Sequence, residues 1–142
     1  MPLLAESIET QLLKQYLEQV GGLIYGEVPI GKIPSRRLWS DKCTTRRIDG
    51  VRIPLDCKSE DILHFQTHQA QFIEQIRDCV PEIIEVKSSL NRLVIGQALA
   101  AEDLFPVQYD VSKVQVVIVC RRTDSAMEWV CQKRNIQVVK IV

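Results

Sequence analysis

The sequence predicts one α/β domain with a central mixed β-sheet flanked by helices. Apolar residues recur at helical spacing near the start of the chain, and several short runs rich in Val and Ile have the composition of strands. Helical segments alternate with these runs, which is typical of a layered α/β domain. The chain has 142 residues, 46% of them hydrophobic, and this is enough for a single core.

The first half of the chain predicts one helix and two strands. Residues 5–20 show helical spacing and end at a glycine pair. Residues 23–33 have strand composition but contain glycine and proline, which favours an edge strand or a strand followed by an irregular loop. Residues 44–55 form the next predicted strand. By simple alternation Asp49 shares a face with Val51 and Ile53, so either that face is apolar elsewhere or a bulge near the following glycine changes the register.

The second half predicts further helices and strands around the stretch 83–97. Residues 59–79 form an inserted helix before that stretch. After it, residues 114–120 are apolar almost throughout, as expected for a strand covered on both faces. A capping box at Ser125 begins a helix to about residue 134, and residues 136–142 form a last strand.

The stretch 83–97 predicts a buried strand that leads directly into a helix. On an extended strand, Glu85 and Lys87 project from one face while Ile84 and Val86 project from the other. A carboxylate and an ammonium on a core strand are costly to remove from water, which favours a functional role. The alternative is a salt bridge at a strand end.

The helix that follows should place a glutamine near that strand. Asn91 is a good N-cap, and Pro106 is expected to end the helix. Gln97 falls among apolar residues that share one helical stripe and should pack on the sheet: Leu90, Leu93, Ala101 and Leu104.

These residues resemble the motif of the PD-(D/E)XK nuclease superfamily, which has a restriction-endonuclease-like fold. The motif joins an acidic residue on an earlier strand, here Asp49, to the Glu85-x-Lys87 strand and a following helix with Gln97. Ile48 stands where the family name has proline, a position that varies in the family. The predicted element order also matches the α-β-β-β-α-β nuclease core, with a helix inserted and a helix and strand appended.

The resemblance implies a metal-dependent endonuclease that hydrolyses DNA phosphodiester bonds. Mg²⁺, with Mn²⁺ as a substitute, prefers oxygen ligands and keeps several waters. The implied ligands are the Asp49 and Glu85 carboxylates, the Val86 carbonyl and Glu9 on the first helix. Lys87 would stabilise developing negative charge and orient the attacking water, and Gln97 would hold Lys87 or that water. Glu9 has the alternative of being an ordinary solvated helix charge.

Charge distribution suggests where DNA would bind. The net charge is zero, but residues 32–52 carry seven basic side chains against two acidic ones. The candidate phosphate contacts in this segment are Arg36, Arg37, Lys42, Arg46, Arg47 and Arg52. Alternatively, these charges solvate the outer face of a hairpin. Trp39 either stacks on a nucleotide or packs under its own loop.

The cysteines, the two histidines and the hydropathy of the chain bear on its cellular compartment and on a possible second metal site. Five cysteines without CxxC spacing fit buried, reduced thiols better than a disulfide framework. His64 and His68 lie four residues apart on the predicted inserted helix, but they lack the glutamate of an HExxH motif. No secretory leader or membrane-spanning run is evident, so a cytoplasmic location is expected.

Two further expectations concern assembly and the competing function. One domain holds one such site, so cutting both DNA strands would favour a homodimer or a higher homo-oligomer. The alternative function is a non-catalytic module of the same fold that binds DNA or a protein. A third option is an enzyme that acts on another phosphorylated substrate.

Overall fold

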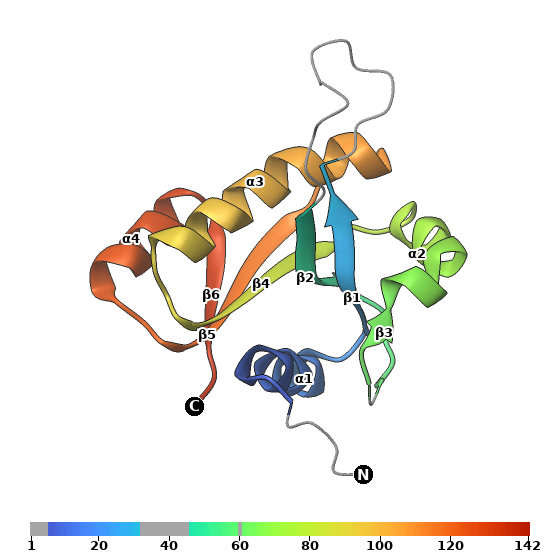
Figure 1. The fold of residues 1–142 in the computed structure, drawn as a ribbon. Helices are drawn as coiled ribbons and strands as arrows, with labels where there is room; N and C mark the ends of the chain where they lie inside the picture. The colour runs from blue at the N-terminus through green and yellow to red at the C-terminus, as the bar shows by residue number, and fades with distance from the viewer. Residues whose placement is uncertain (1–5, 32–45, 60) are drawn as a thin grey trace.

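The protein has a six-stranded mixed β-sheet flanked by four helices (Figure 1). The computed structural model describes residues 6–31, 46–59 and 61–142. The helices are α1 (Ile8–Val20), α2 (Gln69–Ile76), α3 (Arg92–Tyr109) and α4 (Ser125–Lys133), with a 3₁₀ turn η1 (Phe65–Thr67). The strands are β1 (Leu23–Ile30), β2 (Arg46–Ile53), β3 (Leu63–His64), β4 (Glu82–Ser89), β5 (Gln115–Arg122) and β6 (Ile136–Lys140).

The sheet has the strand order β3-β1-β2-β4-β5-β6 and confirms the predicted mixed architecture. β1 pairs antiparallel with β2, and β2 pairs antiparallel with β4. The β4–β5 and β5–β6 pairs are parallel, as is the short pairing of β1 with β3. Because β3 has only two residues, β1 is nearly an edge strand, in agreement with its interrupted sequence.

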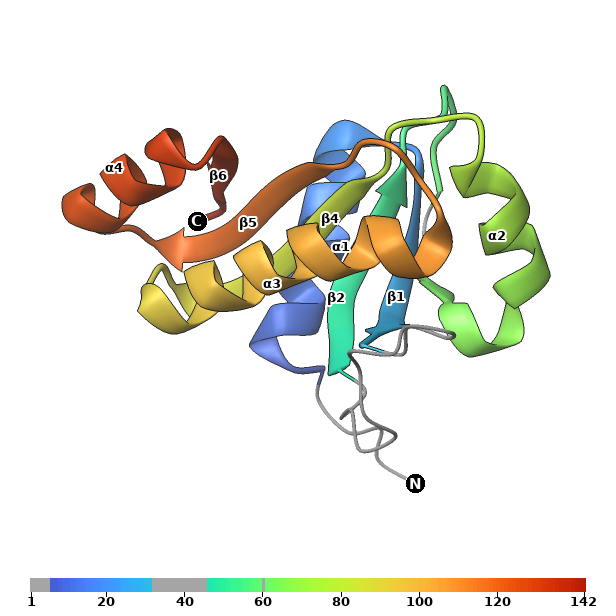
Figure 2. The same ribbon diagram turned by 90° about the horizontal axis from the view of Figure 1, so that it is seen from above.

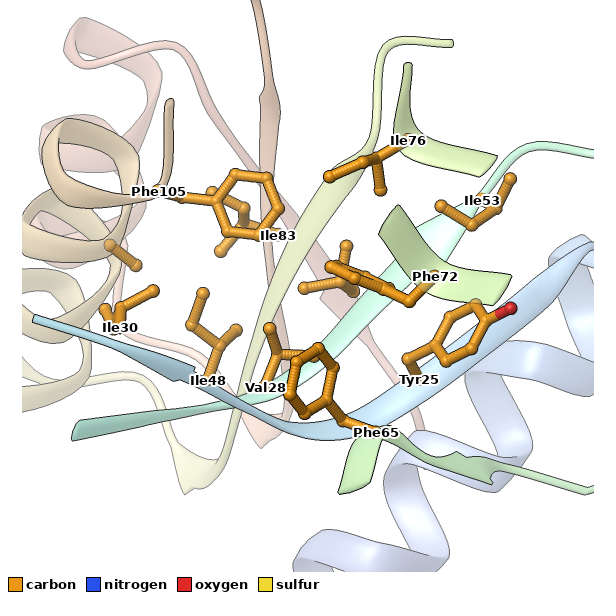
Figure 3. Packing of buried hydrophobic residues seen from close by; sticks show 12 residues of the cluster. Tyr25, Val28, Ile30, Ile48, Ile53, Phe65, Phe72, Ile76, Ile83 and Phe105 are labelled. Atoms are coloured by element: carbon orange, nitrogen blue, oxygen red, sulfur yellow. The ribbon is translucent and has the colours of Figure 1, made fainter. Parts of the chain in front are cut away.

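Helices cover both faces of the sheet. α1 lies on one face and α3 crosses the other, with α2 and α4 near opposite ends of the sheet (Figures 1 and 2). Beneath α2 and α3, Phe72 and Phe105 pack edge-to-face with ring centroids 6.3 Å apart, in a cluster that also contains Tyr25 and Ile83 (Figure 3). The core therefore has separate apolar clusters on the two faces of the sheet.

Simple alternation would place Asp49 on the same face of β2 as Val51 and Ile53. In the structure the alternation breaks within β2, but no extra residue is inserted into the strand. Ile48 and Val51 belong to the same buried cluster although they are three positions apart, which regular alternation would place on opposite faces. Gly26 still pairs with Gly50, and Val28 pairs with Ile48, so the register is constant across the break. The break lies opposite Glu27, which has a left-handed φ of 56° within β1. Asp49 thus sits at a point where regular side-chain alternation stops.

A buried polar network fixes the end of α1 to the sheet. The Arg52 guanidinium donates to Glu82 Oε2 at 2.9 Å and to the Gly21 carbonyl at 2.8 Å. Tyr16 donates to the other Glu82 oxygen at 2.6 Å. The Arg52 side chain is only 12% exposed, so its guanidinium forms its hydrogen bonds within the protein. These bonds leave the guanidinium poorly presented to a ligand, which weighs against the predicted role of Arg52 as a DNA-phosphate contact.

The inserted segment is only partly helical. A helix over residues 59–79 was expected, but the chain forms β3 and η1 before α2 begins at Gln69. The two-residue pairing of β3 with β1 ties the segment to the sheet, and Phe65 is buried from η1. Tertiary pairing therefore replaces the first helical turns that the apolar spacing favoured.

The α3 helix begins as predicted and continues beyond its expected end. Asn91 Oδ1 accepts from the Val94 amide at 3.0 Å, which confirms the N-cap. The helix runs through Pro106 to Tyr109, whose ring lies 4.6 Å from Phe105 between centroids. Proline disrupts a helix interior, but here the packing of the last turn into the aromatic cluster outweighs that cost.

The expected apolar stripe of α3 is also rotated. Leu93 is 61% exposed and Gln97 is exposed, although both were expected to face the sheet. The buried side chains of the helix are Val94, Ile95, Ala98, Ala101 and Phe105. This buried face combines large side chains with two alanines, and it leaves Leu93 on the exposed side of the helix.

Two smaller expectations need correction. Asp124, rather than Ser125, caps α4, because its Oδ1 accepts from the Ala126 and Met127 amides. The four described cysteines are free as expected, and Cys120 and Cys131 are buried, but Cys57 is exposed. Among the described helices, none is long and apolar enough to span a membrane.

Gly50 should be needed for close packing of α1 on the sheet. A Cβ at this position would lie 3.0 Å from Ile24 Cγ2 and 3.1 Å from Leu13 Cδ1. We expect Gly50→Ala to lower the free energy of unfolding by about 1–3 kcal/mol, the usual cost of overpacking a core. Urea unfolding measures the change. Gly96→Ala is the control, since its new Cβ would meet nothing within 4 Å; equal stability of Gly50→Ala and wild type would contradict the packing argument.

Candidate active site

The predicted acidic and basic residues meet in one cavity of about 920 Å³, which is lined by the central strands β2 and β4 and by the beginnings of α1 and α3. β2 contributes Asp49, and β4 contributes Glu85 and Lys87. The remaining lining comes from the end of β1, further residues of β2 and β4, the first turn of α1 with its N-cap, and the first half of α3. The full lining is Ser7, Glu9, Ile30, Arg46, Arg47, Asp49, Glu85, Val86, Lys87, Arg92, Leu93, Gly96, Gln97 and Ala100.

Asp49 lies where β2 and β4 separate. The recorded pairing of these strands ends at Gly50 and Ile84. Beyond that point Asp49 Oδ2 accepts a hydrogen bond from the Val86 amide at 2.8 Å, so a side chain replaces the missing strand partner. Because the N–H and C=O of a strand residue point to the same edge, the Val86 carbonyl is directed towards the same gap.

Asp49 and Glu85 form an acidic pair that lines the cavity. Each carboxyl group shifts the pKa of the other, and Glu85 is only 5% exposed. Burial, followed by the charge of Asp49, raises the pKa of Glu85 from 4.5 to about 9. Burial also raises the pKa of Asp49, although the Val86 amide and Lys87 oppose this shift. At neutral pH the pair therefore holds a proton that a cation could replace.

Lys87 and Gln97 lie on the walls of the same cavity. Lys87 is half-buried and close enough to Asp49 to lower the pKa of that carboxyl group by its charge. Gln97 is exposed on the flank of α3 that lines the cavity. The structure therefore brings Gln97 to the predicted end of the strand, although through a rotated helix face.

Glu9 lies near the acidic pair without joining a complete ligand set. Its charge helps to raise the pKa of Asp49, which places it within electrostatic range. Ser7 caps α1 by accepting from the Thr10 amide at 3.1 Å, and this fixes the turn that carries Glu9. Within residues 6–31, 46–59 and 61–142, no three His, Cys, Asp or Glu side chains are grouped so that they could hold a metal ion.

The predicted DNA contacts have different outcomes. Arg46 and Arg47 line the cavity, and Arg47 also pairs with Glu27 at 3.3 Å on the surface. Arg36, Arg37 and Lys42 lie outside the described residues, as does Trp39. Because Arg52 is bonded within the protein, Arg46 and Arg47 are the basic residues that the described part of this segment contributes to the cavity.

The two histidines have local partners and different secondary structure from that expected. His64 ends β3 and its Nε2 lies 3.3 Å from Glu27 Oε2. His68 precedes α2, with Nδ1 2.9 Å from Thr67 Oγ1. They are therefore not neighbours on one helical face, which removes the geometric basis for treating them as a metal pair.

Several cavity residues were missed by sequence reasoning. Arg92, Leu93, Gly96 and Ala100 line the cavity from α3. Leu93, Gly96 and Ala100 follow the N-cap at helical spacing, which is the signal that could have placed them on one face of the helix. That signal was hidden because Leu93 was assigned to the core.

The acidic pair should make metal-free stability depend on pH. Because the folded-state pKa of Glu85 is raised, the proton on Glu85 contributes stability that is full below about pH 4.5 and is lost as the pH rises through about 9. Glu85→Gln keeps a neutral side chain at every pH. In urea unfolding with a chelator, we expect this variant to be more stable than wild type near pH 9, with the difference shrinking towards pH 5. Parallel pH profiles for the two proteins would contradict the raised pKa.

The donor set fits a hard divalent cation. Two carboxylates and a strand carbonyl face a cavity with room for water, and Mg²⁺ is commonly held by one or two carboxylates with several retained waters. The pair also carries a proton that such an ion would displace, as metal ligands generally require. No family model, curated protein or solved structure matches this chain.

Proposed function

We propose that the protein is a metal-dependent DNA endonuclease with a restriction-endonuclease-like fold. The observation that carries this proposal is the buried Asp49–Glu85 pair, which shares one cavity with Lys87. The element order around β4 and α3 supports it, since it resembles the PD-(D/E)XK core. In this proposal β3, η1 and α2 form the insertion before the Glu-x-Lys strand.

Asp49, Glu85 and the Val86 carbonyl would hold the ion. A bound Mg²⁺ or Mn²⁺ would neutralise phosphate charge and favour deprotonation of water at ordinary pH. Glu9 would add negative charge near the ion, since its carboxylate is close enough to raise the pKa of Asp49. The pair must release its proton to bind the ion, so binding should strengthen as the pH rises.

Lys87 would supply the positive charge that the reaction needs. Its ammonium lies in the cavity with the acidic pair, where a phosphate that reaches the carboxylates would also reach it. Fixed charge in a partly dry site stabilises developing negative charge more strongly than it would in water. Gln97 would position Lys87 or the attacking water from α3. Arg46 and Arg47 would contact flanking phosphates.

The test is cleavage of plasmid, branched and single-stranded DNA with Mg²⁺, Mn²⁺ or a chelator. We expect nicking or cutting with either ion and none with the chelator. Cutting of both strands would require two copies of the site, and so we propose a homodimer or higher homo-oligomer. DNA binding without cleavage under every ion condition would instead support a non-catalytic module.

A further inference from the structure

The cavity has two chemically different walls. The sheet side carries charged groups, including Asp49, Glu85 and Lys87. Opposite them, beyond Arg92 on α3, lies a wall without charge, which we call the α3 wall; it consists of Leu93, Gly96, Gln97 and Ala100. A ligand in this cavity therefore meets several charges from the strands, whereas on α3 beyond Arg92 it meets four uncharged residues, of which Gly96 and Ala100 are small.

Gly96 is unfavourable for the helix and unnecessary for its packing. Glycine in a helix interior costs about 0.5–1 kcal/mol relative to alanine, because it loses more backbone freedom on folding. A Cβ at Gly96 would meet nothing within 4 Å, so no neighbouring element requires the absence of a side chain. The open space in front of Gly96 belongs to the cavity that holds the acidic pair.

Leu93 supports the view that the α3 wall contacts a ligand. It is 61% exposed one turn before Gly96, on the same cavity wall. A single exposed leucine is ordinary on a protein surface. Here, however, it stands beside an open glycine and faces a group of charges, which is an arrangement suited to a ligand with one anionic side and one less polar side.

We propose that Gly96 is a specificity-determining residue at which the substrate strand approaches α3 most closely. The proposal rests on the nuclease function proposed above. Phosphates face Lys87 and the acidic pair, while the adjoining sugar and base lie against the α3 wall. The missing side chain at Gly96 leaves the space that the sugar and base occupy.

The test compares Gly96→Trp, which fills this space, with two other variants. Gly96→Ala adds only a methyl group, and Val107→Trp places the same bulk on an exposed part of α3 outside the cavity lining. Binding is measured by fluorescence anisotropy of a labelled oligonucleotide in chelator, and cleavage is measured with Mn²⁺. Calorimetric titration with Mn²⁺ alone reports on the acidic pair.

We expect Gly96→Trp to weaken DNA binding by about tenfold or more, a loss of about 1.4 kcal/mol, and to slow cleavage. Its Mn²⁺ affinity and thermal stability should stay near those of wild type. Gly96→Ala should raise thermal stability and weaken DNA binding less than Gly96→Trp does, because a methyl group fills only part of the space, and Val107→Trp should bind DNA normally. If Gly96→Trp fails to fold or to bind Mn²⁺, the smaller replacement Gly96→Leu is used in its place. Wild-type DNA affinity of Gly96→Leu would then overturn the proposal.

The two proposals can fail separately. If wild type cleaves DNA and Gly96→Trp binds and cleaves equally well, the role of Gly96 is wrong and the nuclease function stands. If wild type binds DNA without cleaving it and Gly96→Trp loses that binding, the contact at the α3 wall is supported and catalysis is not. If wild type does not bind DNA at all, the role of Gly96 is overturned.

Discussion

Lys87→Ala is expected to slow DNA cleavage by about 10²- to 10³-fold, the usual effect of removing one preorganised group that stabilises transition-state charge. The side chain is half-buried in the cavity that contains Asp49 and Glu85, so solvent water is a poor substitute for its charge. Single-turnover cleavage of labelled DNA in saturating Mn²⁺ measures the effect. Because Lys87 is not one of the proposed ligands, Mn²⁺ binding should persist.

Lys113→Ala is the matched control for this prediction. Lys113 is exposed just before β5 and lies outside the cavity lining, so its loss removes the same charge from elsewhere on the protein. We expect this variant to cleave at the wild-type rate. Equal rates for Lys87→Ala and wild type would exclude a catalytic role for Lys87.

Asp49→Asn should abolish the stabilisation of the fold by divalent ions. A ligand present at 100 times its dissociation constant stabilises the folded state by about 2.7 kcal/mol. This stabilisation should be lost when the Asp49 carboxylate is replaced by an amide. The asparagine oxygen can still accept from the Val86 amide, so the local fold should be retained. Thermal unfolding of both proteins with and without Mn²⁺ measures the difference, and cleavage should be lost in parallel.

The pH dependence of this stabilisation provides a second readout. Protons compete with the ion for the pair, and the pKa of Glu85 is raised to about 9. The shift caused by Mn²⁺ in wild type should therefore be larger at pH 8 than at pH 6. Asp103→Asn, on an exposed part of α3 outside the cavity lining, should behave as wild type. An undiminished Mn²⁺ shift in Asp49→Asn would remove Asp49 from the proposed ligand set.

The local strand pattern was predictable because period-two alternation needs only neighbouring residues. Alternation predicted that Glu85 and Lys87 share one face of the strand and that Val86 lies on the other. In the structure Glu85 and Lys87 line one cavity, and the Val86 side chain packs in the core beneath α1. The same logic failed at Asp49. The face change opposite Glu27 depends on pairing between β1 and β2, which alternation within one strand does not encode.

The basic segment shows why charge counts are insufficient to locate a binding surface. Arg52 and Arg47 are five residues apart on one strand, yet Arg52 is internal and Arg47 lines the cavity. The difference comes from Glu82 and Tyr16, which are distant in sequence and compensate the burial of the guanidinium. Likewise, α3 packs a face that includes Ile95 and Phe105 on the sheet and leaves Leu93 exposed, a choice that apolar spacing alone did not decide.

The amino-acid sequence by itself determined the kind of fold and the chemistry available on β4, because helix and strand periodicities and the identity of adjacent side chains are local properties. Only the tertiary structure decided that Asp49 meets Glu85, that α1 brings Glu9 nearby and that α3 presents Gly96 to the cavity. Those outcomes depend on where β2 and β4 separate and on how each helix packs. Both are set by contacts between residues far apart in the chain.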